Sequence, residues 1–214
     1  VTGSPGSGSE ELIEALAGAR HRSDQALWLL SDGEPAPVDG CGRVALGRDD
    51  EAAAHAVARA ARLRPDLLVA PTLAGPAIAA LLDAVSRGAG GVIAGGSAGT
   101  LRQAVSRIST EVAAVRALGI DTAREWLASS FDLGLEVTRL RDGRLRVTRV
   151  AELRSGLHGS TLRDIFTFAY HRTAAGGSIE GTFCASGTVP RIVEDLAARG
   201  MPLDITIFRR HPSS

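Results

Sequence analysis

Short apolar runs alternate with segments of helical periodicity over the first half of the chain. Residues 26–30 and 67–70 are continuous apolar runs, which are typical of strands buried on both faces of a parallel sheet. A further strand is predicted at 92–94, and the three- and four-residue spacing of apolar positions predicts helices at 10–19, 50–63, 76–87 and 101–115. Strands separated by helices need crossover connections, so we expect a mainly parallel sheet with helices on both faces.

The pattern changes after residue 119. Alternation of apolar and polar residues predicts strands at 133–140 and 145–153, and a second pair of strands is expected at 164–171 and 178–184. Helices are expected on either side of these strands, at 122–131 and 189–199. Asp142-Gly143 joins the first two strands, and Gly176-Gly177 joins the second pair. Asp-Gly between alternating runs is a strong hairpin signal. We therefore expect one domain, 1–214, with an α/β core at about 1–119 and an extension of helix and antiparallel hairpins at about 120–214.

The opening decapeptide has the shape of a phosphate-binding loop. Gly3 and Gly8 have the spacing of the glycines in G-x-x-x-x-G-K-[ST], and a helical pattern follows them. The whole loop reads Gly3, Ser4, Pro5, Gly6, Ser7, Gly8, Ser9 and Glu10. Ser9 stands where the motif has lysine, and Glu10 stands where it has the Ser or Thr that holds magnesium.

Those two replacements weaken the loop as a nucleotide site. Backbone N–H groups from Gly3 to Gly8 can still form an anion-binding concavity at a helix N-terminus. Loss of the lysine removes roughly 1.5 to 3 kcal/mol, and a carboxylate facing a triphosphate adds repulsion of about 4 kcal/mol per charge at 4 Å near a surface. The alternative is an ordinary helix start, with Ser9 as capping residue and Glu10 and Glu11 in the first turn. Either way, we expect a loop that keeps its fold but binds ATP weakly or not at all.

Composition limits the classes of function. The chain has 214 residues, 44% of them hydrophobic, and a net charge of zero, so it can bury a sizeable core but has no excess of basic residues to indicate nucleic acid binding. Cys41 and Cys184 match no metal or redox spacing, which favours a reducing, cytosolic compartment. No apolar run reaches the 18 residues of a membrane span, and no signal peptide precedes the loop. The chain begins at Val1, inside the expected first strand, which indicates a fragment without its N-terminal part.

Several segments resemble one protein family. Residues 64–76 are similar to R-P-D-R-I-I-V-G-E-V-R-G-P of the type II and type IV secretion and pilus ATPases, and most similar to the CpaF or TadA branch, which assembles tight-adherence (Tad) pili. Further similar segments follow in the same order at residues 91–100, 139–143, 162–168 and 181–190. Because nearly the whole chain is covered in order, the resemblance implies a three-layer, RecA-like P-loop NTPase fold.

The resemblance also identifies positions where this chain departs from the family. The family's Walker B glutamate falls on Thr72, the arginine after it on Ala74, and the histidine of its His box on Ser97. The Glu-Asp pair of its Asp box becomes Ser31-Asp32, so one acid is retained. Phosphoryl transfer depends on charges placed where negative charge develops. With the lysine, the magnesium hydroxyl, the acid and the histidine replaced, we expect no catalytic residue and no metal ligand.

Two classes of function follow from the resemblance. The favoured one is a structural or regulatory subunit with lost or weak ATP hydrolysis; the alternative is an active motor that powers pilus assembly or protein export. The family implies ATP and Mg²⁺ as cofactors, a hexameric ring, inner-membrane platform proteins as partners, and a place at the cytoplasmic face of the membrane. For this chain we expect no cofactor and no nucleic acid, with a homo- or hetero-oligomer. An unrelated phosphate binder that uses the glycine loop alone is a further alternative.

Overall fold

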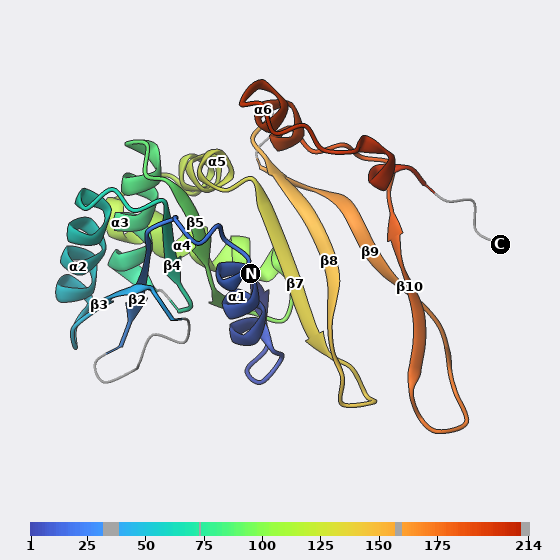
Figure 1. Ribbon diagram of the computed structural model, residues 1–214. Coiled ribbons are helices and arrows are strands. Elements are labelled where there is room, and N and C mark those ends of the chain that lie inside the picture. Colours follow the sequence, from blue (N-terminus) through green and yellow to red (C-terminus); the bar gives the residue numbers. More distant parts are fainter. Residues whose placement is uncertain (32–38, 73, 157–159, 211–214) are drawn as a thin grey trace.

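A parallel sheet lies at the centre of the fold in a computed structural model, which describes residues 1–31, 39–72, 74–156 and 160–210. Its strands follow the order β3-β2-β4-β5 and all pair in parallel, which confirms the predicted α/β fold (Figure 1). Their bounds are β2 Ala26–Leu30, β3 Gly42–Ala45, β4 Leu67–Ala70 and β5 Gly91–Ala94. The sequence pattern missed β3, because this edge strand is short and half exposed and has no continuous apolar run.

Helices cover both faces of this sheet, as predicted. They are α1 Ser9–Gly18, α2 Asp50–Arg62, α3 Gly75–Ser86, α4 Leu101–Arg116 and α5 Ile120–Ser130. Successive residues of a strand point to opposite faces. Trp28 and Val69 therefore pack with Ile13 of α1, whereas Leu29 and Leu68 pack on the other face with α2 to α5. A strand buried on both sides has to be apolar at every position, which explains the continuous runs in the sequence.

Gly95 joins this sheet to a second one. It lies between β5 and β6 (Gly96–Ser97), and its N–H donates to the Ala70 carbonyl (2.8 Å) on the β4 side. On the other side β6 pairs in parallel with β1 (Thr2–Gly3), so Gly95 connects the edge strand of one sheet to the edge strand of the other. A Cβ on Gly95 would lie 1.8 Å from the Pro71 carbonyl oxygen, so only glycine fits at this crossing.

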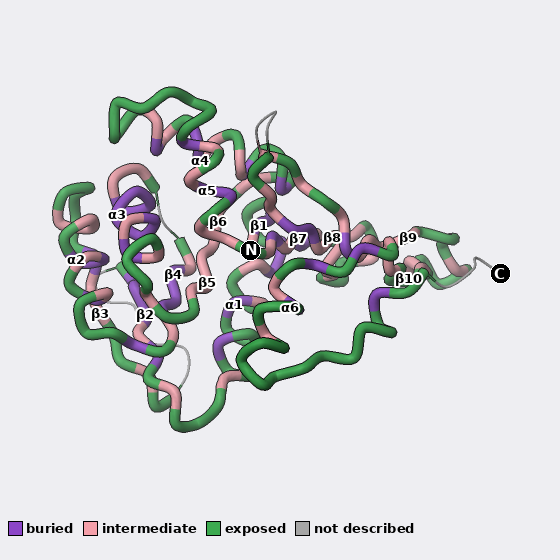
Figure 2. Tube along the Cα trace, turned by 90° about the horizontal axis from the view of Figure 1, so that it is seen from above, coloured by how far each residue is buried: buried purple, intermediate pink, exposed green. Residues whose placement is uncertain are grey.

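The second sheet continues from β1 into antiparallel hairpins and has the order β10-β9-β8-β7-β1-β6. The hairpin strands are β7 Leu133–Arg139, β8 Leu145–Arg154, β9 Thr161–Thr173 and β10 Ile179–Ala185, followed by α6 Ile192–Ala198 and the short helix η1 Ile205–Phe208. Both predicted hairpins are confirmed, although β9 is five residues longer than the predicted 164–171. They extend away from the helices (Figure 1), and most residues of their turns are exposed. Buried residues gather instead at α3 and β4 (Figure 2). Ile165, Val193 and Phe208 form a small separate core where α6 and η1 cover this sheet.

In the part of the chain that the structure describes, no helix combines the length and the apolarity that a bilayer span requires.

Replacement of Gly95 by alanine tests the junction between the sheets. The new Cβ would meet backbone, which cannot move aside as a side chain can, so we expect Gly95→Ala to lower the free energy of unfolding by about 3 kcal/mol. Gly18→Ala is the matched control: Gly18 ends α1, and a Cβ there meets nothing within 4 Å. The control should be neutral or stabilise by about 0.5 kcal/mol. Urea denaturation measures both, and equal stabilities for the two variants would contradict this account of the junction.

Candidate functional site

The glycine loop begins where β1 ends. β1 lies between β6 and β7, and Gly3 is opposite Ser97 on one side and Val137 on the other. The loop then turns back through a hydrogen bond from the Ser7 N–H to the Ser4 carbonyl (2.9 Å). Gly6 and Gly8 have φ angles of +73° and +88°, which other residues rarely adopt. The loop thus has the strand, turn and helix order of a phosphate-binding loop.

The helix start differs from the predicted one. Gly8, not Ser9, is the N-cap of α1, and no side chain caps the first turn. Ser9 is already helical, so its hydroxyl is not placed to accept from the N–H groups one turn on. Glu10 and Glu11 do lie in the first turn, as predicted, where they interact favourably with the helix dipole. Glu10 is exposed, at the end of the helix where an anion would bind.

Two contacts fix the underside of the loop. Ser7 is buried beneath it, and its Oγ lies 1.9 Å from where a Cβ on Gly3 would be. This hydroxyl has no hydrogen-bond partner among the described residues. Gly8 packs on Leu145 of β8, whose Cδ1 would lie 2.4 Å from a Cβ at that position. The loop is therefore packed directly on the hairpin β7–β8.

A guanidinium group also reaches the loop. Arg139 Nε donates to the Gly6 carbonyl (2.8 Å), and its Nη1 donates to the Gly143 carbonyl (2.9 Å) in the turn between β7 and β8. In the sequence the nearest basic residue to the loop is Arg20, a full helix away. Strand pairing nevertheless brings Arg139 to the loop from 133 residues further on. The family-like segment at residues 139–143 was the only sequence signal for this contact.

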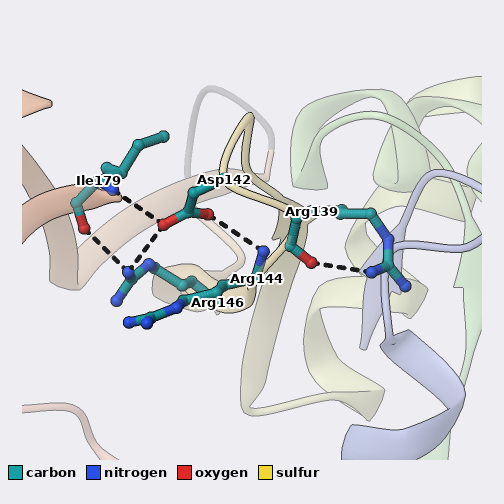
Figure 3. A network of polar contacts seen from close by, with 6 residues as sticks. Arg139, Asp142, Arg144, Arg146 and Ile179 are labelled. Atoms are coloured by element: carbon teal, nitrogen blue, oxygen red, sulfur yellow. Dashed lines mark hydrogen bonds and ion pairs between the residues drawn. The ribbon is translucent and has the colours of Figure 1, made fainter. Parts of the chain in front are cut away.

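The turn that Arg139 contacts is itself tied to the second hairpin (Figure 3). Asp142 accepts from the N–H groups of Ile179 (2.9 Å) and Arg144 (3.1 Å) and forms an ion pair with Arg146 (3.3 Å). Arg146 also donates to the Ile179 carbonyl (2.9 Å). The hydrogen bond from Ile179, with those from Arg144 and Arg146, holds the pKa of Asp142 below its ordinary value of 3.8. A polar chain thus links the glycine loop to the start of β10.

The other predicted site positions lie at the same edge of the sheet, where parallel strands end. Ser97 ends β6 directly beside Gly3, and its side chain is exposed. Thr72 follows β4 and is also exposed. Asp32, the retained acid of the Asp box, lies outside the described residues. Thr72 and Ser97 therefore lie at the ends of strands on the side of the sheet where the loop begins.

An arginine and an acid at this edge were missed from the sequence. Glu111 of α4 accepts from the N–H of Gly75 (3.0 Å), the first residue of α3, and pairs with Arg107 (3.0 Å). Arg107 Nη2 would lie 3.5 Å from a Cβ on Gly96. The i, i+4 spacing of Arg107 and Glu111 indicates a helical ion pair. The same spacing gives no sign that Glu111 also caps α3, whose first residue lies close to the end of β4.

The side chains at the loop do not form the donor set that Mg-ATP requires. Ser9 supplies no cation, Glu10 adds negative charge, and the Arg139 groups that contact the loop are already bonded to backbone carbonyls. Among the described residues, His, Cys, Asp and Glu side chains form no group of three that could hold a metal ion. What remains is the backbone: the first-turn N–H groups of α1, which no side chain caps. Such a site is suited to a small anion more than to a magnesium-bound triphosphate.

Comparison with solved structures identifies the fold. No protein-family model matches the sequence, and no curated protein does. The chain is similar to the VirB11 ATPase of the Brucella suis type IV secretion system, with a TM-score of 0.62 and 19% identity over 70% of this chain and 47% of VirB11. It is also similar to the ATPase DotB of Legionella pneumophila, with a TM-score of 0.51 and 17% identity over 67% of this chain and 42% of DotB.

The chain thus spans less than half the length of either ATPase. At these identities the likeness concerns the fold, and it confirms the predicted α/β class with a parallel-sheet core, which the chain shares with these two ATPases.

Replacement of Arg139 tests its role as a tether. Arg139→Gln removes both hydrogen bonds to backbone carbonyls, so we expect faster hydrogen exchange of the amides from Gly6 to Glu10. Because the side chain is exposed, the loss of stability should be only about 1 kcal/mol. Arg141→Gln is the control, since Arg141 is exposed in the same turn. Equal exchange in the two variants would contradict the tether.

The lowered pKa of Asp142 predicts a pH-dependent contribution to stability. A depressed carboxyl pKa stabilises the fold above the ordinary value of 3.8, and this stabilisation is lost as the pH falls through the lower pKa of the folded state. Asp142→Asn should therefore lower the melting temperature by a few degrees at neutral pH, and the difference from the wild type should shrink below pH 3.8. Asp132→Asn, an exposed site before β7, is the control. A difference that stays constant with pH would show that the charge of Asp142 contributes nothing.

Proposed function

We propose that this chain is the RecA-like part of a subunit related to the type II and type IV secretion ATPases, closest to the CpaF or TadA branch of Tad pilus systems. In this proposal it hydrolyses ATP weakly or not at all and has a structural or regulatory role in the assembly. The fold that it shares with VirB11 supports the lineage. The order of the family-like segments along the chain supports the branch.

One observation supports the proposed loss of ATP hydrolysis: the set of side chains at the edge where β1, β4 and β6 end. Thr72 and Ser97 are exposed there without charge, and Glu10 occupies the first turn of α1. A carboxylate at 4 Å from one phosphate charge costs about 4 kcal/mol near a surface. The lost lysine costs roughly 1.5 to 3 kcal/mol more. Both terms oppose the charge-assisted hydrogen bonds, of roughly 1.5 to 3 kcal/mol each, that the glycine-loop amides would donate to a phosphate.

The proposed assembly is based on the rings of the family that the sequence resembles. Secretion ATPases of the resembled family form hexameric rings, so we propose that this chain joins a homo- or hetero-oligomer at inner-membrane platform proteins on the cytoplasmic side. The open edges of the sheet, β3 and β10, and the region from Ser155 to His171 are the proposed contacts between subunits.

An active motor is the second candidate, and two contacts favour it. Arg139 brings a positive charge to Gly6, and Glu111 brings a carboxylate to the start of α3, near the end of β4. Rearrangement of these two side chains would supply a cation and an acid at the same edge as the loop. Both are engaged in the structure, Arg139 with carbonyls and Glu111 with Arg107 and Gly75.

Measurement of ATP turnover separates the two candidates. We expect no magnesium-dependent phosphate release from the wild-type chain above the level of a heat-denatured sample. The measurement should include Arg139→Gln and Glu111→Gln. Steady turnover by the wild type that is lost in either variant would contradict the proposal and establish the motor.

Restoration of the motif tests whether the loop is still of phosphate-binding shape. The double variant Ser9→Lys, Glu10→Thr supplies the cation and the hydroxyl, so we expect it to bind Mg-ATP and to melt about 2 to 4 °C higher when the nucleotide is present, as a stabilisation of about 1 kcal/mol gives in a chain of this size. Ser9→Lys with Glu10 retained is the control and should gain less. No shift in the double variant would show that the backbone, and not only the side chains, has lost the function.

A further inference from the structure

A cavity lies at the edge of the sheet opposite the glycine loop. It has a volume of about 660 Å³ and is bordered by residues 64–66, which precede β4, and by residues 88–90, which precede β5. The loop follows the carboxyl end of β1, whereas these segments enter the amino ends of parallel strands. Any ligand of the cavity would therefore bind at a site separate from the loop.

Small residues on α2 and α3 make the space. The two helices pack side by side (Figure 1), and the cavity between their last turns is lined by Ala58, Ala61, Ala80 and Ala84. The methyl groups of these four alanines form an apolar surface, the floor of the cavity. The volume falls within the range of about 300 to 1,000 Å³ that is typical of sites for small molecules.

Arginines form the rim of the cavity. They are Arg62, Arg64 and Arg87, and all three side chains are exposed. Arg87 is engaged with Asp83, through a hydrogen bond to its carbonyl (3.1 Å) and a long ion pair (3.7 Å). Arg62 and Arg64 have no acid partner among the residues that the structure describes. The one acid of the rim, Asp66, accepts from the Gln25 N–H (2.8 Å), so the cavity keeps an excess of positive charge although the whole chain is neutral.

The backbone of Arg64 is strained. Its φ angle is +51°, in the left-handed region, and its N–H donates to the Ala61 carbonyl (3.1 Å) just after the end of α2. Glycine is the usual residue at this position after a helix, and a residue before proline, here Pro65, favours an extended backbone. Strained residues are concentrated at ligand sites, where the strain positions a group. Here it holds a cationic side chain at the mouth of the cavity.

We propose that this cavity binds a phosphorylated small molecule of nucleotide size. The guanidinium groups of Arg62 and Arg64 hold the phosphate, because their planar donor pairs match its oxygens. The alanine floor takes the apolar part of the ligand. Arg62 also borders a neighbouring hollow with Arg43 and Arg59, and this local concentration of positive charge attracts anions to the face. The proposal is independent of the glycine loop and of ATP turnover.

Calorimetric titration with AMP and with inorganic phosphate tests the site in the whole chain at low salt. We expect saturable binding of AMP, with weaker binding of phosphate because it makes no contact with the floor. Arg64→Gly is the informative variant, because glycine relieves the strain at φ +51°. It should raise the melting temperature of the ligand-free protein and weaken AMP binding by about tenfold, the loss of a charge-assisted contact. Arg62→Gln should weaken binding to a similar extent.

The control is Arg163→Gln, which removes the same charge from an exposed position on β9. It should change neither melting temperature nor affinity. Three results would overturn the proposal: no saturable binding of either probe to the wild type, AMP affinity that is unchanged in Arg64→Gly and Arg62→Gln, or an equal loss in the control. The second result would mean that Arg64 only ends a helix, or that AMP binds elsewhere, as at the glycine loop.

Discussion

The parallel hydrogen bonds of β1 hold the two halves of this protein together. β1 has only two residues, Thr2 and Gly3, and it pairs with β6 on one side and with β7 on the other. β6 continues from β5 through Gly95, where the close approach of the Pro71 carbonyl leaves no room for a side chain. The position of the glycine loop follows directly, because the loop begins at the last residue of β1.

The loop also depends on the antiparallel extension. Leu145 packs on Gly8, Arg139 bonds to Gly6, and Asp142 ties the same turn to the start of β10. Core and extension are therefore linked at the loop, and a movement of the hairpin β7–β8 would reach it through these contacts. Such a link would let contacts of the hairpins influence the loop without any change in the loop's own residues.

Charge is distributed unevenly between the two edges of the parallel sheet. At the edge with the loop, Glu10 and Glu11 lie in the first turn of α1, and the basic residues Arg107 and Arg139 are engaged. At the opposite edge, the rim arginines surround a cavity with one acid, itself hydrogen-bonded. The net charge of zero does not reveal this arrangement. Because salt screens charges that lie far apart on the surface, each edge presents mainly its own local charge to a ligand.

The sequence by itself determined the fold class, because a strand buried on both faces must be apolar at every position and the helices between strands keep a regular spacing. It also determined the chemistry missing from the loop, since no fold can turn Ser9 or Glu10 into a lysine. Only the tertiary structure decided what surrounds the loop. Strand and helix pairing brings Arg139, Leu145 and Glu111 to their positions across long stretches of chain, and the periodicity of the sequence does not show such contacts. For the same reason β6 and the arginine cavity were visible only once neighbouring strands and helices were in place.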